Sequence, residues 1–444
     1  MVMLLAIIVS GCETGKSATQ DDNVGAFQDS AGVGAGYTDT NADADTDVDS
    51  DTDSDTGTGP DTDSDTDTDS NIDTDADSDV DSYTGSDAES DAGSDAATGT
   101  DGDTDADTDM DTGTDSDTQP VVDPSDAHVV LFIIDGLQPD TAATAAANGA
   151  ENLKMVMEQG VTVEEAYCVS PTPSLKLPDG SKPWGGTSPP NVAIHTGCHV
   201  FDSRDMDDIF LAARESGIKS VFSGGDKNYG AFDTADFHYA GKFSDEDTVS
   251  RALQHFTEDG VRLIRVHLQR IRDDWNGPEG KTDPNSEYIG AVVNADRQLG
   301  VLIETLTAAG VWKNTYLIVS SDHGMGSSGG SNHPAGHRSS WEIFMGFYGP
   351  GIKQGTTIAY AESPDMAILT AHLLGLRPLL GHTDPDVTIE PKGVTGTLLT
   401  NIFDGAPETL DHPQVIRRYL EANNYSPPGD FVSYRADILE LLAQ

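Results

Sequence analysis

The chain has 444 residues and a formal net charge of −53. The charge is uneven, because residues 1–126 hold 36 acidic residues and one basic residue, and 41 acidic and 23 basic residues remain for residues 127–444. This balance leaves no surface suited to nucleic-acid binding, and three cysteines are too few for a disulfide framework. Residues 127–444 are long enough for one large α/β domain.

The first residues indicate export. Residues 1–9 are an apolar stretch too short to span a bilayer. Residues 9–12, Val-Ser-Gly-Cys, resemble the lipobox of bacterial lipoproteins, although no Lys or Arg precedes them. The resemblance implies a signal peptide over residues 1–11 and a membrane anchor through lipid on Cys12. Because Glu13 rather than Asp follows, it implies a place in the cell envelope or at the surface, in the outer membrane of a Gram-negative bacterium.

Residues 12–126 are predicted to be a disordered linker rich in Asp, Thr and Ser. Asp-Thr and Asp-Ser pairs repeat from Asp39 to Asp117 with almost no large apolar residues. Such a segment cannot bury enough surface to offset its ordering entropy, and its like charges repel one another. We therefore expect an extended acidic tether ahead of the domain.

The first ordered element is expected at residues 129–134, Val-Val-Leu-Phe-Ile-Ile. A continuous apolar run without alternation predicts a strand buried on both faces, as in a parallel sheet. Asp135 and Gly136 end the run. Because open α/β sheets carry their chemistry at the carboxyl ends of strands, Asp135 is a candidate site residue. The alternative is that Asp135 caps a helix beginning near Pro139.

A loop rich in Pro, Gly and Ser is predicted over residues 170–190. It contains Thr187 and Ser188 just ahead of two prolines and a helix start. A hydroxyl at a helix N-terminus lies near partial positive charge, which favours an alkoxide and binds phosphate oxygens. Thr187 or Ser188 is therefore a candidate nucleophile, and the alternative is a simple N-cap.

A second apolar strand, residues 316–319, leads into Asp322 and His323. A carboxylate beside an imidazole is a donor pair suited to zinc or a similar divalent ion, and the following glycines permit a tight turn. The alternative is that Asp322 caps the next turn while His323 is exposed. Both residues follow a strand, as Asp135 does.

The remaining elements complete an α/β pattern. Apolar runs predict strands over residues 262–268 and 344–348, and helical spacing of apolar residues predicts helices over residues 287–306 and 365–374. Together they predict an α/β domain with a mostly parallel central sheet flanked by helices.

These motifs resemble the alkaline phosphatase superfamily, and within it the type I phosphodiesterase and nucleotide pyrophosphatase branch. The resemblance covers residues 128–376 and rests on Asp135-Gly136, on residues 187–197 and on residues 321–325. It implies an alkaline phosphatase-like catalytic domain over residues 127–444. The Cys/Ser-x-Pro-x-Arg signature of sulfatases is absent, which disfavours that branch.

The resemblance suggests two nucleophiles. In the family a Thr-Gly pair lies nine residues after the nucleophile, and Thr196 lies nine residues after Thr187. In nucleotide-cleaving members a Pro-Asn pair follows at two and three residues, which points to Ser188 and ends at Asn191. Thr187 is preferred, and Asn191 is expected to help stabilise the phosphoryl oxygens.

The resemblance also implies a site for one or two divalent cations, usually zinc. The ligands implied for the first ion are Asp135, Thr187, Asp322 and His323.

For the second ion, the family supplies an Asp-x-x-x-His segment and a later His. Asp273 or Asp274 keeps the carboxylate, but Pro278 stands where the His would be when counted from Asp274. The later His is His333 or His337, and its distance along the chain from the Gly-Pro-Gly at residues 349–351 favours His333. The second ion therefore binds weakly, differently or not at all.

The resulting hypothesis is a metal-dependent hydrolase of small phosphoric esters, monoesters or diesters. A threonine nucleophile and a phospho-enzyme intermediate are implied by the resemblance. The alternative from another class is a surface lipoprotein of the same fold that binds a metal or an anion without turnover.

Overall fold

The computed structural model describes residues 122–170, 188–200, 206–226, 234–273, 281–326, 333–383, 393–428 and 431–444, except for the side chains at 188, 272, 273 and 431. The predicted signal peptide, Cys12 and the linker up to residue 121 lie outside the described residues. Among those described, no helix combines the length and the apolar composition that crossing a membrane requires.

Within the described ranges, eight strands form one sheet in the order β4-β3-β5-β1-β6-β7-β2-β8. The strands are β1 (His128–Ile134), β2 (Val161–Tyr167), β3 (Ser220–Gly224), β4 (Phe237–Ala240), β5 (Leu263–Leu268), β6 (Thr315–Ser320), β7 (Met345–Tyr348) and β8 (Thr356–Glu362). β7 is antiparallel to both of its neighbours, and the other neighbouring pairs are parallel. The predicted α/β class with a mostly parallel sheet is confirmed.

Helices follow most of the strands. They are α1 (Pro139–Ala147), α2 (Glu151–Gln159), α3 (Ser188–Thr196), α4 (Ile209–Glu215), α5 (Asp245–Asp259), α6 (Arg270–Asp273), α7 (Glu287–Ala308), α8 (Arg338–Trp341), α9 (Asp365–Leu373), α10 (Val415–Ala422) and α11 (Phe431–Leu442). Ser286 caps α7 by accepting a hydrogen bond from the Ile289 amide at 3.1 Å, which explains why this long helix begins where the sequence predicts.

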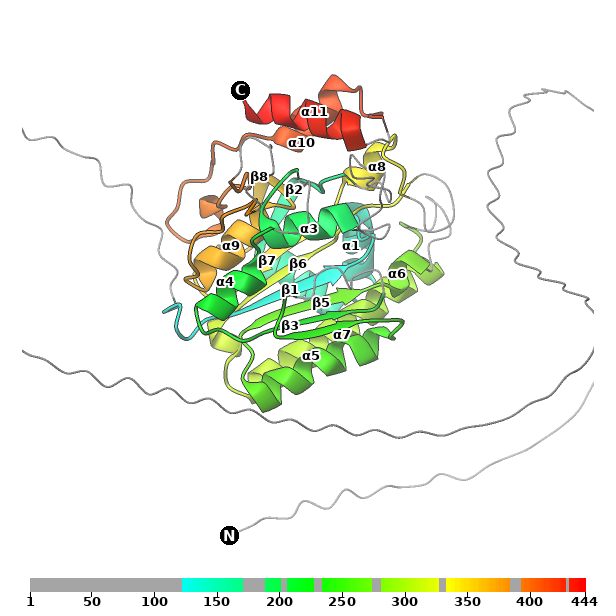
Figure 1. Ribbon diagram of the computed structural model, residues 1–444. Helices are drawn as coiled ribbons and strands as arrows, with labels where there is room; N and C mark the ends of the chain where they lie inside the picture. The colour runs from blue at the N-terminus through cyan, green and yellow to red at the C-terminus, as the bar shows by residue number, and fades with distance from the viewer. Residues whose placement is uncertain are drawn as a thin grey trace, which may run out of the picture. The chain divides into compact units, whose positions relative to one another are not determined.

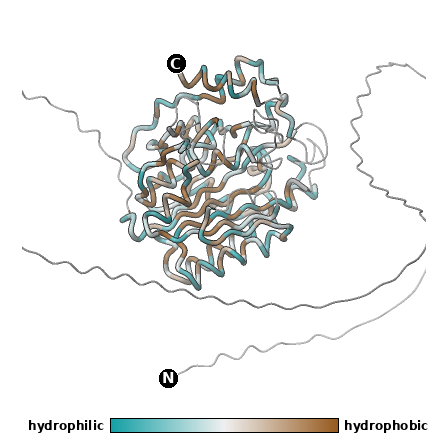
Figure 2. Tube along the Cα trace, in the orientation of Figure 1, coloured by the Kyte–Doolittle hydropathy of each residue, from teal (hydrophilic) through white to brown (hydrophobic). Residues whose placement is uncertain are grey.

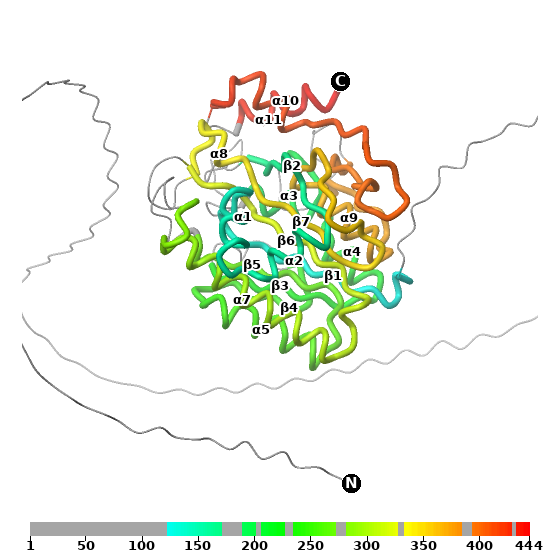
Figure 3. Tube along the Cα trace, turned by 180° about the vertical axis from the view of Figure 1, so that it is seen from behind, coloured from blue at the N-terminus to red at the C-terminus, as the bar shows by residue number. Residues whose placement is uncertain are grey.

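Helices cover both faces of the sheet. α3, α4 and α9 lie on one face of the sheet (Figure 1). α1, α2, α5 and α7 lie on the opposite face, which Figure 3 shows from behind. Each face of the sheet has its own hydrophobic core, and β1 contributes to both. Leu131 and Ile133 belong to the first core, which includes residues of α3, α4 and α9, and Phe132 and Ile134 belong to the second core, which includes residues of α1, α2, α5 and α7. This two-sided burial accounts for its unbroken apolar run, and brown hydrophobic segments follow the central strands in Figure 2.

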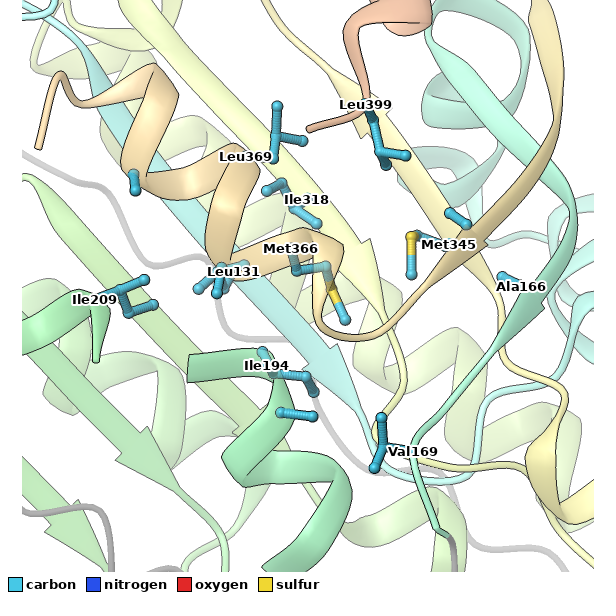
Figure 4. Close-up of a cluster of buried hydrophobic side chains, with 14 of the residues drawn as sticks. Leu131, Ala166, Val169, Ile194, Ile209, Ile318, Met345, Met366, Leu369 and Leu399 are labelled. Carbon is cyan, nitrogen blue, oxygen red and sulfur yellow. The ribbon is translucent and has the colours of Figure 1, made fainter. Parts of the chain in front are cut away.

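The first core binds α3 and α9 to the central strands. Figure 4 shows Leu131 of β1 and Ile318 of β6 between Ile194 of α3 and Leu369 of α9. All four side chains are buried. The packing fixes α3 above the central strands, so that residues of this helix reach the carboxyl ends of β1 and β6.

The strands expected from apolar runs are found as β1, β5, β6 and β7, and the helices expected at residues 287–306 and 365–374 are α7 and α9. The antiparallel direction of β7 was not predicted. Because β6 and β7 run in opposite directions, residue 321 after β6 and residue 344 before β7 lie at the same edge of the sheet. This keeps His333, between those strands, at the edge where β6 ends.

A second group of buried polar residues lies outside the predicted site and joins β8 and α9 to the chain before α10. We call it the C-terminal network; its members are His199, Tyr360, Glu362, Asp365 and His412. His199 Nε2 lies 2.5 Å from Glu362 Oε2, and the Tyr360 hydroxyl donates to Glu362 Oε1 at 2.5 Å. His412 Nε2 lies 3.0 Å from Asp365 Oδ2. Each acid also accepts backbone amides, so the group is closely hydrogen-bonded.

Candidate metal site

Asp135 directly follows β1, a central strand, and lies where the parallel strands of the sheet have their carboxyl ends. Asp135 follows the last paired residue of β1, is fully buried, and donates its amide to Leu268 O of β5 at 2.9 Å. Gly136 has φ +81°, and a Cβ there would lie 2.9 Å from Met325 Sδ, so the turn requires glycine. The N-cap of α1 is Gln138, not Asp135. The carboxylate therefore does not serve as the cap of this helix.

The loop after β6 brings Asp322 and His323 alongside. Ser321 Oγ accepts the Leu137 amide at 2.9 Å and donates to His323 O at 2.7 Å, which ties this loop to the turn after β1. A Cβ on Gly324 would meet Ser339 O at 2.0 Å, so only glycine fits this close approach of two backbones. These contacts hold the loop after β6 against the turn after β1.

The side-chain donor atoms of Asp135, Asp322 and His323 lie close together. Each offers a ligand atom, these atoms lie within 4.8 Å of one another, and all three residues are buried. His323 Nε2 is 3.4 Å from Asp135 Oδ1 and 3.6 Å from Asp322 Oδ2. Donors of one tetrahedral zinc ion lie about 3.3 Å apart, given bonds of about 2.0 Å. We call these three residues the carboxylate–imidazole cluster.

The protonation of His323 suits a metal ligand. Its Nδ1 lies 3.0 Å from Gly324 O, and because a carbonyl only accepts hydrogen bonds, Nδ1 carries the hydrogen. In the neutral form of the ring, Nε2 would present its lone pair toward the two carboxylates, as in ligating histidines whose other nitrogen donates to a carbonyl. With neutral His323, the two buried carboxylates carry a charge of −2, which a divalent cation balances. The donor set therefore fits a zinc-like ion.

Helix α3 contributes Asn191, which the sequence predicted at the site. Asn191 Nδ2 donates to Asp322 Oδ2 at 3.1 Å, and Asn191 Oδ1 accepts from the guanidinium of Arg265 on β5. Both residues are fully buried. Because the guanidinium only donates, it fixes the amide with its NH2 group toward Asp322.

Arg265 also contacts the ring of His195 on α3. Burial, together with the positive charge of Arg265, holds the pKa of His195 well below its ordinary value. The neutral ring then accepts a hydrogen bond from the guanidinium. A buried arginine is thus anchored between two residues of α3, which secures the helix over the site.

The other predicted residues fall in different places. His333 is buried, and its ring stacks on His323 with 3.7 Å between centroids. His337 is exposed at the N-cap of α8. Thr187 and Asp274 lie outside the described residues, as do the side chains of Ser188, which opens α3, and Asp273, which ends α6. Their roles, and the choice between His333 and His337, stay predictions.

Arg265 and His267 were not singled out from the sequence. They alternate on β5 with Ile264, Val266 and Leu268, which belong to the second core. By register, Arg265 pairs with Leu131 and His267 with Ile133, so both lie on the side of α3. The sequence could have indicated them, because two polar residues stand two positions apart in an otherwise apolar strand, and side chains two positions apart lie on the same face of a sheet.

Comparison with protein families gives one partial match. The Sulfatase family model matches residues 234–367, which is less than half of the chain. The matched part includes β5, Asp322 and His323, but neither Asp135 nor Thr187. It therefore does not bear on the nucleophile.

Comparison with individual proteins gives a similarity to human ectonucleotide pyrophosphatase/phosphodiesterase family member 5, 29% identical over 135 residues. These residues make up 29% of this chain and 28% of the relative, so the chain spans little more than a quarter of its length.

Two solved structures are similar in part. The murine ectonucleotide pyrophosphatase/phosphodiesterase 5 in complex with AMP has a TM-score of 0.44 and 17% identity, over 62% of this chain and 100% of that one. The phosphonate monoester hydrolase of Agrobacterium radiobacter has a TM-score of 0.45 and 16% identity, over 63% and 78%. The chain is thus similar in part to the Sulfatase family and to these proteins.

Proposed function

We propose that this protein is a hydrolase of the alkaline phosphatase superfamily that cleaves phosphoric esters with a bound divalent cation. One observation carries the proposal: Asp135 and the neighbouring pair Asp322 and His323, more than 180 positions further along the chain, present buried donor atoms within 4.8 Å of one another. The partial sequence similarity to a human pyrophosphatase/phosphodiesterase supports this choice of chemistry.

The proposed nucleophile is Thr187, because α3 begins at the next residue and its Asn191 contacts Asp322. A cation bound by the cluster would polarise the phosphoryl group and favour the alkoxide of the nucleophile. The threonine oxygen bonds to phosphorus while the ester P–O bond breaks and the alcohol leaves with a proton. Water then cleaves the phospho-threonine and restores the hydroxyl.

Two features of α3 suit this reaction. Its N-terminal amides point toward an incoming anion, and the partial positive charge there favours phosphoryl oxygens. The buried Asn191 amide is held by Arg265, so it keeps one orientation throughout turnover. Sulfate esters are the less suited substrates, because the Cys/Ser-x-Pro-x-Arg pattern counted from Ser188 puts Val192 at the position of the arginine.

The test is hydrolysis of bis-p-nitrophenyl phosphate, p-nitrophenyl phosphate and p-nitrophenyl sulfate with added Zn²⁺ or Mn²⁺. We expect turnover of a phosphate ester, loss of turnover on chelation, and at least about 1,000-fold lower kcat in Thr187→Ala, the range seen when a nucleophile is removed. Ser188→Ala is the matched control. The same loss in Ser188→Ala alone would move the nucleophile to Ser188. No turnover with any metal would instead support the alternative, a binding protein without catalysis.

A further inference from the structure

A polar cavity of about 660 Å³ lies at the carboxyl ends of β3 and β5. Gly225 and Asp226 line it after β3, Gln269 and Arg270 line it after β5, and residues at the start of α5 and within α7 complete it. This volume falls within the range of roughly 300–1,000 Å³ that is usual for sites of small organic molecules. The cavity therefore has room for the organic part of an ester.

The cavity neighbours the carboxylate–imidazole cluster along the same edge of the sheet. The Asp135 amide donates to Leu268 O at 2.9 Å, and Gln269 is the next residue of the chain. The Gly225 amide donates to His267 O at 3.0 Å, which joins the end of β3 to the end of β5. Because neighbouring strands are about 4.8 Å apart, the cavity begins about one strand spacing from Asp135. An ester whose phosphorus lies at the cluster can therefore reach the cavity with its organic group.

The charges of the lining do not favour an ionic group. The lining holds three acidic and two basic side chains, those of Asp226, Asp245, Glu246, Lys242 and Arg270. An anionic group would therefore meet an excess of like charge. An organic cation would find the ring of Phe243, also in the lining, already beneath the guanidinium of Arg251, whose central carbon lies 4.2 Å from the ring centroid. A neutral polar group fits this mixture best.

Three amide side chains suit the lining to hydroxyl groups; they belong to Gln269, Asn294 and Gln298. Gln269 Nε2 donates to Asp226 Oδ2 at 2.8 Å, and Asn294 Nδ2 donates to Asp245 Oδ2 at 3.4 Å. Each of these carboxylates thus orients an amide. An amide carries both donors and an acceptor, and a hydroxyl likewise both donates and accepts. Donors and acceptors spread around one cavity match a group that carries several hydroxyls.

We propose that this cavity binds the organic part of the substrate, and that this part is a neutral group with several hydroxyls, such as a sugar or another polyol. The proposal rests on the proposed function and specifies its substrate class. An alkyl chain in the same place would displace water from the polar lining without offering hydrogen bonds in return. Because such a loss costs free energy, the cavity discriminates against alkyl esters.

Steady-state kinetics of the full chain with Zn²⁺ test the proposal. The substrates are glucose 6-phosphate and n-hexyl phosphate as monoesters, and the p-nitrophenyl ester of each as diesters. The two alcohols have the same number of carbon atoms and differ in their hydroxyls. We expect a kcat/KM at least about tenfold higher for the glucose ester, the effect of roughly one or two net hydrogen bonds. Equal values, or a preference for the hexyl ester, would overturn the proposal and leave the proposed function standing. No hydrolysis of any of these esters would overturn the proposed function itself.

Two variants test whether the preference arises in the cavity. Gln298→Met removes the amide from α7, and Lys242→Met removes an exposed donor, a surface change that leaves folding intact. In each variant the preference for the glucose ester should fall at least about threefold, as expected when roughly one hydrogen bond is lost. Gln254→Met makes the same change at an exposed position of α5 outside the lining, and it should keep the wild-type preference. An unchanged preference in both cavity variants would overturn the proposal.

Discussion

Two buried clusters of the same residue types differ in their spacing. In the C-terminal network, His199 and Glu362 are 2.5 Å apart and His412 and Asp365 are 3.0 Å apart, so the groups bond directly to each other. In the carboxylate–imidazole cluster, the nitrogen-to-oxygen separations are 3.4 and 3.6 Å. Residue type alone therefore does not distinguish a structural cluster from a metal site. The spacing differs in the direction that the proposed ion requires, because donors that share an ion stand further apart than donors that share a proton.

The largest effect should come from Asp322→Asn. This change removes one negative charge and one ligand, and we expect loss of bound Zn²⁺ and a fall in kcat/KM of at least about 1,000-fold, or about 4 kcal/mol. Metal content and steady-state rates measure it. Full metal content with normal rates would show that the cluster is structural, like the C-terminal network.

The opposite pattern is expected from Glu362→Gln, which leaves His199 facing a neutral amide. Breaking a buried pair is expected to lower the free energy of unfolding by about 3 kcal/mol, seen as a lower urea midpoint. The metal content of the folded protein should equal that of wild type. If Glu362→Gln lost metal while keeping its urea midpoint, the distinction between the two clusters would fail.

A smaller effect should follow from Arg265→Lys. The ammonium keeps the charge but not the planar fork that holds Asn191 and His195, so the amide facing Asp322 loses its fixed orientation. We expect zinc affinity about tenfold lower, as for other groups that orient ligands. Arg262→Lys, immediately before the same strand, is the control, because the Arg262 guanidinium donates to the backbone carbonyls of Ala127 and Pro124. Equal affinities in both variants would remove Arg265 from the site.

The smallest effect concerns pH. Burial opposes protonation of His412, but its hydrogen bond to Asp365 and the charges of Asp365 and Glu362 outweigh this and raise its pKa above 6.5. Because the pKa of His412 is higher in the folded protein than in the unfolded chain, its protonation stabilises the fold. This stabilisation is complete at pH values below 6.5, the ordinary pKa of histidine, and is lost as the pH rises through the folded-state pKa. The free energy of unfolding should therefore fall above pH 6.5, and fall less steeply in His412→Asn. Equal slopes would contradict the assigned charge.

Much of the site's framework is visible in the sequence, because β1 and β6 are buried on both faces and end abruptly in acids. The unbroken apolar runs before Asp135 and Asp322 predict both strands, and parallel neighbours bring their ends together. Asn191 donates a hydrogen bond to Asp322, and its predicted role at the site stays a prediction. Local patterns suffice here because each strand carries its functional residue at its own end.

Other features depend on contacts between distant segments. His267 sits inside β5, where a single imidazole among apolar residues resembles a core residue, and only the register with Ile133 places it beside Asp135. The C-terminal network joins His199 to Glu362 across 163 positions without a local motif. The direction of β7 was missed for the same reason, since strand direction follows from tertiary packing rather than from an apolar run.

The most direct test of the central claim is anomalous diffraction at the zinc edge from crystals of the protein grown with Zn²⁺. The account predicts one strong peak about 2.0–2.2 Å from donor atoms of Asp135, Asp322 and His323, the usual zinc bond lengths. A peak elsewhere, with these three side chains bonded only to protein, would contradict it.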